Sequence, residues 1–116
     1  MNQQCTTTST TPGNYQFYTN NTAPGLVTRF RFDLDARIGT TEITSGFNNY
    51  YEVLQNTVSI VTFIQLNGSA WASYRLNNFI PGGGYWEVNN PYFITSSGGF
   101  TFSNTTYYCI YMQLVI

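Results

Sequence analysis

The chain has no histidine and no lysine, and only 8% of its 116 residues carry a charged side chain. Without histidine it cannot form a Ser-His-Asp or Cys-His catalytic group, and it lacks the commonest metal ligand. Without lysine it cannot form a Schiff base with a carbonyl substrate. Two cysteines do not by themselves supply the four ligands of a structural zinc site. We therefore expect a protein that is not an enzyme and that holds no cofactor and no metal.

The chain also has little net charge and no long apolar run. Its formal net charge is −1 and its isoelectric point is about 4.9, so it offers no electrostatic attraction to nucleic acid or anionic lipid. No run approaches the roughly 20 apolar residues of a membrane-spanning helix. Its first 14 residues, MNQQCTTTSTTPGN, show no basic and apolar regions of a signal peptide. We expect no nucleic-acid partner, no membrane insertion, and a location in a virion or outside cells.

Residues that favour β-strands are abundant instead. Aromatic residues make up 18% of the chain, with ten Tyr and nine Phe, and these favour half-buried strands as Val, Ile and Thr do. Turn signals divide the chain into eight to ten short segments, and no long helical period is present. The sequence predicts an all-β fold, an antiparallel β-sandwich of the jelly-roll or Ig-like type. Residues 1–14 contain little to bury and are predicted as an extended N-terminal arm, followed by a single β-sandwich domain over residues 15–116.

The most regular strand pattern spans residues 26–38, LVTRFRFDLDARI. Its residues alternate between two faces over the whole length, which is typical of a half-buried strand. One face carries five of the nine charged residues in the chain (four Arg and five Asp or Glu): Arg29, Arg31, Asp33, Asp35 and Arg37. We interpret this face as a candidate interface. A reversal at Gly39-Thr40 then places Glu42 near Arg37 or Asp35 as a cross-strand partner.

Residues 57–66 and 69–76 flank the dipeptide Asn67-Gly68 and predict a β-hairpin. Asn-Gly favours a type I′ turn, because both residues of that turn need a positive φ. This loop pairs Ile64 with Trp71 and Phe63 with Ala72. Both faces of the hairpin carry large apolar side chains, so either it lies deep in a sandwich or its second face meets another chain. The candidate interface residues on the second face are Ile60, Ile64 and Trp71.

The remaining turn signals place strands at residues 15–18, 50–54, 85–88, 92–95, 100–103 and 107–116. The segments 92–95 and 100–103 are predicted to pair as a hairpin across the intervening Ser-Ser-Gly-Gly. Residues 107–116 alternate well and predict a terminal strand.

Asp33 and Asp35 are the best candidates for chemistry, because they lie two residues apart on one face. Paired carboxylates serve glycoside hydrolysis or Ca²⁺ binding. Arg31 and Arg37 flank them, however, and opposite charges favour the ionised form, which suits ion pairs better than a general acid. We therefore expect a structural or interface role for the pair, with metal binding and catalysis as lesser alternatives.

An aromatic group near the glycine-rich loop is a candidate platform for a glycan or a partner. Its members are Tyr85, Trp86 and Tyr92, and Trp and Tyr faces stack on sugar rings. The alternative, which we favour, is that these side chains close one end of the core. Cys5 and Cys109 are likewise open to two interpretations, either a disulfide or, as we expect, two free thiols.

Two functions fit these observations. The first is a non-enzymatic structural protein of an assembly, such as a capsid, decoration or spike component of a virus or phage. Its partners are then further copies of this chain or other proteins of the same assembly. The second is a secreted or surface adhesin-like module that binds carbohydrate, such as a host-surface glycan, through the aromatic platform.

Overall fold

The computed structural model describes residues 1–55 and 57–115 of the chain. Over these residues the chain forms eleven strands, one short 3-10 turn (Pro24–Leu26) and one α-helix, α1 (Gly46–Leu54). The strands, in chain order, are β1 (Asn2–Thr6), β2 (Gln16–Thr19), β3 (Arg29–Asp33), β4 (Ala36–Ile38), β5 (Thr41–Ile43), β6 (Val58–Gln65), β7 (Trp71–Asn77), β8 (Ile80–Pro81), β9 (Tyr85–Asn89), β10 (Tyr92–Ser96) and β11 (Tyr107–Leu114). The prediction of an all-β protein is confirmed.

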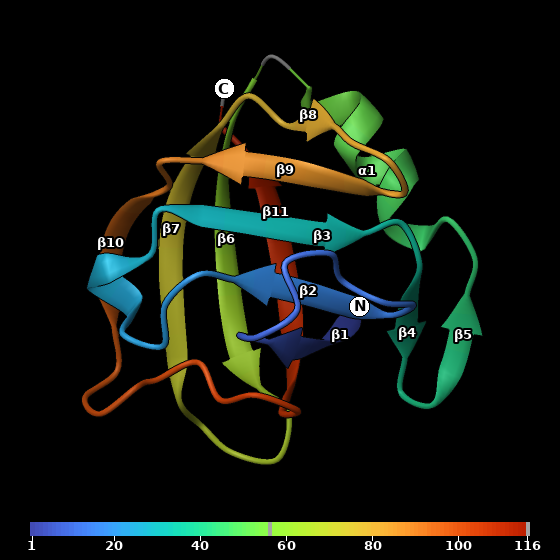
Figure 1. Cartoon of the computed structure of the whole chain (residues 1–116). Helices are drawn as coiled ribbons and strands as arrows, with labels where there is room; N and C mark the ends of the chain where they lie inside the picture. Colours follow the sequence, from blue (N-terminus) through green and yellow to red (C-terminus); the bar gives the residue numbers. More distant parts are fainter. Residues whose placement is uncertain (56, 116) are drawn as a thin grey trace.

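The strands belong to one sheet that folds over on itself. Its order is β10-β7-β6-β11-β1-β2-β3-β9-β8, with β4 and β5 attached beside β1. In Figure 1, β6, β7 and β11 run along one layer and β2, β3 and β9 cross in front of them. β1 pairs with β2 in parallel, so the sheet is mixed and the prediction of a wholly antiparallel sheet is wrong. This continuous path does not show the separate sheets of an Ig-like or jelly-roll sandwich.

Stacked aromatic rings fill the space between the two layers. Phe63 of β6 lies at their centre, fully buried, with its ring centroid 5.0 Å from that of Phe30 and 5.2 Å from that of Phe17. The rings lie offset, tilted or edge-to-face, the arrangements that aromatic pairs prefer. Alternate residues of β3, β6 and β7 supply this core, as the period of two in their sequences requires.

The hairpin of β6 and β7 has the predicted register. Ile64 pairs with Trp71 and Phe63 with Ala72. The turn differs from the prediction, because neither Asn67 nor Gly68 has a positive φ. The Gly68 N–H instead donates to the Gln65 carbonyl at 3.2 Å. The loop is therefore wider than the two-residue type I′ turn that the dipeptide suggested, while the strand pairing is unchanged.

The long strand predicted over residues 26–38 is interrupted. Residues 29–33 form β3 and residues 36–38 form β4, and the chain bends between them at Leu34 and Asp35. The bend lets β3 pair with β2 and β9 while β4 pairs with β1 and β5. The predicted reversal at Gly39 is confirmed, with φ of +61° at that glycine, and Arg37 pairs with Glu42 across it.

The strand predicted at residues 50–54 is wrong, because this segment lies in α1. Phe47, Tyr51 and Leu54 are spaced by four and three residues and are all buried, which is the pattern of an amphipathic helix. A helix of nine residues presents too few repeats for its period to stand out against the neighbouring strands.

The N-terminal segment is also corrected. Residues 2–6, predicted as part of an extended arm, form β1 between β11 and β2. Gln3 is fully buried there, because its side-chain amide donates to the backbone carbonyls of Asp33 and Asp35 at 2.9 and 2.8 Å. A polar segment can thus occupy a central position in the sheet when its side chains find buried acceptors.

Two predictions near the C-terminus differ in outcome. Residues 100–103 do not form a strand, and β10 pairs with β7 instead. Phe100 and Phe102 are nevertheless buried and contribute to the core.

The terminal strand is confirmed as β11 over residues 107–114, while Ile116 lies outside the described residues. Within the described part of the chain, no helix has the length and apolar character needed to span a bilayer.

Candidate functional site

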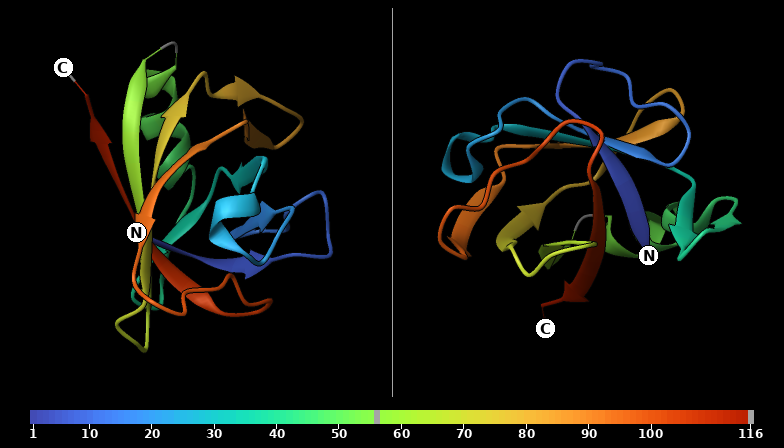
Figure 2. Two further views of the ribbon diagram at one scale, coloured as in Figure 1. Left: turned by 90° about the vertical axis from the view of Figure 1, so that its left-hand side faces the viewer. Right: turned by 90° about the horizontal axis from the view of Figure 1, so that it is seen from below.

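The most distinctive surface is the outward side of the sheet formed by β10, β7, β6 and β11, which we call the outer face (Figure 2). The strand register arranges its side chains in rows across the strands. One row joins Trp71, Ile64 and Cys109, and the next joins Ser73, Thr62 and Tyr111. The third row carries Tyr92, Arg75, Ile60 and Gln113. Three of these residues, Ile60, Ile64 and Trp71, were predicted as interface residues, and the structure brings them together.

The outer face is apolar or uncharged except at Arg75. Its aliphatic and Trp71 side chains are half-buried, whereas Tyr92 and Tyr111 are 60% and 57% exposed. The Thr62 and Ser73 hydroxyls bond to each other at 2.8 Å. The Arg75 guanidinium lies over the Tyr92 ring at 4.9 Å from its centroid. Trp, Tyr and Arg are enriched at the centres of protein interfaces, and Asp and Glu are depleted there.

Sequence reasoning missed Tyr92 and Tyr111 as parts of this surface. The alternation in each strand shows which side every residue faces, but not which strands are neighbours. Tyr111 joins the outer face because β11 pairs with β6, and Tyr92 joins it because β10 pairs with β7. These long-range pairings carry no local signal.

The other predicted interface residues lie elsewhere. Arg29 and Arg31 lie on β3 and both face Glu87 of β9, at 3.8 and 2.7 Å. The hydrogen bond from Arg31 holds the pKa of the Glu87 carboxyl below its usual value. Arg31 also donates to the backbone carbonyl of Thr10 at 2.7 Å and so fastens the loop between β1 and β2. This group is an exposed or half-buried ion-pair network, worth little individually.

Arg37 belongs to a separate cluster. Its guanidinium lies 3.5 Å from the Glu42 carboxylate, donates to the Tyr107 hydroxyl at 3.1 Å, and lies over the rings of Tyr15 and Tyr107. The cluster joins β4, β5 and β11 with the loop before β2. Its contacts are internal, so it serves the packing of the β4-β5 hairpin.

Asp33 and Asp35 accept hydrogen bonds from the backbone at two strained positions. The Asp33 carboxylate accepts from the Tyr15 N–H at 2.8 Å, and the Asp35 carboxylate accepts from the Ser45 N–H at 2.7 Å. Tyr15 and Ser45 have φ of +62° and +58°, in the left-handed region that side chains disfavour. Burial raises the pKa of the Asp33 carboxyl, whereas the hydrogen bonds that it accepts from backbone N–H groups lower that pKa. The two carboxylates therefore fix loops, which supports the structural role expected for them.

We predict that Asp33→Ala lowers the free energy of unfolding by about 1–3 kcal/mol, because it leaves the partly buried N–H groups of Tyr15 and Asp35 without their acceptor. Urea unfolding measures this loss. Asp33→Asn keeps one acceptor oxygen and should recover part of it. Equal stability of Asp33→Ala and the unmodified chain would contradict this role.

The predicted aromatic platform is not assembled. Trp86 is buried in the core and its indole N–H donates to the Asn48 side chain at 2.9 Å. Tyr85 lies under Arg31 on the β3-β9 surface, and Tyr92 lies under Arg75 on the outer face. The three residues follow one another closely in sequence, but the alternation of β9 and the turn before β10 direct them to different places.

The cysteines are free, as expected. Cys5 is buried, and burial raises its pKa to about 12, so its thiol is unreactive. Cys109 lies half-buried on the outer face. Among the residues that the structure describes, no three His, Cys, Asp or Glu side chains come together in a group that could hold a metal ion.

Comparisons of this chain with protein-family models, with curated proteins and with solved structures find no match.

Proposed function

We propose that this protein is a non-enzymatic structural subunit of a protein assembly, and that its outer face is the surface through which copies of the chain associate. The observation that carries the proposal is the composition of that face, where Trp71, Tyr92, Tyr111 and two isoleucines surround a single arginine and no acid. Such a sheet face stacks on another sheet about 10 Å away, with side chains interdigitating.

A second copy of the chain is the partner that this face fits best. Its polar groups are hydroxyls, amides and one guanidinium stacked on a ring, and hydroxyls and amides both donate and accept hydrogen bonds. A surface of this kind is complementary to itself, as a two-fold symmetric interface requires. A virion component (capsid, decoration or spike protein) is the setting we propose, because the low charge and absent catalytic residue types suit a stable assembly. Genes for capsid or tail proteins beside this gene would support that setting, and genes of an unrelated pathway would contradict it.

A pair of matched variants tests the outer face. Ile64→Asp introduces a charge between Trp71 and Cys109 on this face, and Ile38→Asp makes the same exchange at a position on β4 that is 61% exposed and lies off the face. We expect Ile64→Asp to weaken self-association at least ten-fold, because an unpaired carboxylate would be desolvated there. Ile38→Asp should leave it unchanged. Light scattering after size-exclusion chromatography measures the mass, and circular dichroism checks that both variants fold.

Equal association of Ile64→Asp and the unmodified chain would contradict the proposal. So would a chain that stays monomeric and captures no protein produced from the same gene cluster.

A further inference from the structure

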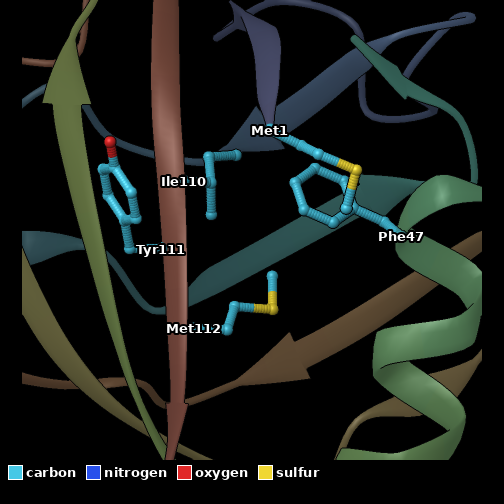
Figure 3. Close-up of a pocket in the computed structure, with 5 residues that line it drawn as sticks. All are labelled: Met1, Phe47, Ile110, Tyr111 and Met112. Atoms are coloured by element: carbon cyan, nitrogen blue, oxygen red, sulfur yellow. The ribbon is translucent and has the colours of Figure 1, made fainter. Parts of the chain in front are cut away.

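A second surface, on the other side of β11, is a groove between this strand and helix α1. Figure 3 shows Met1 and Phe47 on one side of it and Ile110 and Met112 on the other. Two adjoining hollows of about 260 and 380 Å³ make up the groove, and both are lined by Met112. Farther along, Val53 and Leu114 face the second hollow. None of the residues that line the two hollows carries a charged side chain.

The wall formed by β11 presents an unpaired strand edge to this groove. The Ile110 N–H donates to the Met1 carbonyl at 2.8 Å, on the side of β1, while the Val115 N–H donates to the Val58 carbonyl at 3.0 Å, on the side of β6. Because N–H directions alternate along a strand, Met112 and Leu114 point to the same side as Ile110. Pairing with β1 ends before Met112, and among the described residues no backbone hydrogen bond satisfies this edge beyond Ile110.

We propose that this groove binds one extended, uncharged peptide segment of a partner protein, which adds to the free edge of β11 as a further strand. Backbone bonds to Met112 and Leu114 would hold the segment, and its apolar side chains at alternate positions would enter the hollows. This binding site shares only Tyr111 with the outer face, and it does not depend on the function proposed for that face.

The geometry favours a single peptide segment over other occupants. α1 forms the opposite wall, so a whole sheet from a second domain cannot approach the edge as a lone strand can. An acyl chain would fill the hollows but would leave the N–H and C=O groups of Met112 and Leu114 buried without partners, which is costly. None of the lining side chains is charged, so a charged side chain of the bound segment would find no ionic partner among them, which disfavours a charged segment on the same ground.

The register of β1 permits a test with the full chain. Met1 lies opposite Ile110, so four residues added before Met1 would lie opposite Tyr111 to Leu114. We suggest the extension Val-Thr-Val-Thr, which places valine opposite Leu114 and Met112, and as its matched control Asp-Thr-Asp-Thr. Amide hydrogen exchange measured by NMR reports the result. We expect the first extension to slow exchange at Met112 and Leu114 at least ten-fold, with Ile110 unchanged, and the control to have no such effect.

Binding in trans is tested with a fluorescein-labelled peptide that contains Val-Thr-Val-Thr. We expect saturable binding to the unmodified chain and none to the chain whose groove is filled by the valine extension. Val53→Arg, at a groove position that is 71% exposed, should weaken binding at least ten-fold. Glu52→Arg, the next residue on the same helix, should not. Ile64→Asp should also bind normally, so that failure of the groove and failure of the outer face are distinguishable.

Three results would overturn the proposal. The first is equal exchange in the two extended chains together with no binding of the peptide. The second is protection of Met112 and Leu114 that rises with the concentration of the unmodified chain, which would assign the edge to a second copy. The third is binding of dodecanoate that excludes the peptide without protecting either amide, which would assign the groove to an acyl chain.

Discussion

Phe63→Ala is expected to lower the free energy of unfolding by about 3–5 kcal/mol, a large part of the stability of a domain of this size. The Phe63 ring is fully buried and packs against the rings of Phe17, Phe30, Tyr74 and Phe102, with centroid separations of 5.0 to 5.8 Å. Because these rings come from both layers of the sheet, they cannot close over the space that the substitution leaves. The loss of stability therefore includes the cost of the cavity as well as the loss of buried apolar surface.

Ile64→Ala is the matched control, one residue along the same strand with its side chain on the outer face. It should cost only about 1 kcal/mol in a monomer, because this side chain is half-exposed. Urea unfolding at a protein concentration low enough to keep the chain monomeric compares the two. Similar losses for both variants would contradict the assignment of one side of β6 to the core and the other to the surface.

Alkaline pH should destabilise the protein strongly. Burial raises the pKa of the thiol of Cys5 and of the hydroxyls of Tyr51, Tyr74 and Tyr108. Between the unfolded and folded pKa values of each group the folded state binds more protons than the unfolded state, so stability falls as pH rises. The loss begins near pH 9 for Cys5 and near pH 10 for the tyrosines. Each group contributes a slope of about 1.4 kcal/mol per pH unit.

The same experiment has an internal control at neutral pH. With no histidine in the chain, no side chain has an ordinary pKa between about 6 and 8, so stability should be nearly constant there. Urea unfolding at intervals from pH 6 to pH 11 measures both ranges. Tyr74→Phe removes one buried hydroxyl, which donates to the Pro24 carbonyl at 2.8 Å, and should make the alkaline slope shallower. A curve that stays level above pH 10 would contradict the burial of these groups.

Local sequence patterns predicted those parts of the fold that depend on one strand or on two strands joined by a turn. The alternation of β6, β7 and β11 identified their faces, and the spacing around Asn67 fixed the register of the hairpin although the turn itself is of another kind. The three outer-face residues predicted from this hairpin, Ile60, Ile64 and Trp71, were found for the same reason.

The parts that were missed depend on contacts distant in sequence. β1 looks like a polar tail, and the buried side-chain N–H groups of Gln3 find their acceptors in the backbone carbonyls of Asp33 and Asp35, about 30 residues away. Phe100 and Phe102 do not lie in a strand, yet their rings are buried in the core, because packing involves the side chains and not the backbone pairing. The groove beside β11 exists because β1 pairs with only part of that strand, which no local pattern encodes.

Sedimentation velocity of the unmodified chain, from about 1 to about 100 micromolar, is the most direct measurement of whether the outer face is a subunit interface. We predict that the mass rises with concentration above that of a 13.1 kDa monomer. Tryptophan emission, to which Trp71 and the buried Trp86 both contribute, should shift to shorter wavelength over the same range as Trp71 is covered. A single species of monomer mass throughout, with unchanged tryptophan emission, would contradict association through this face.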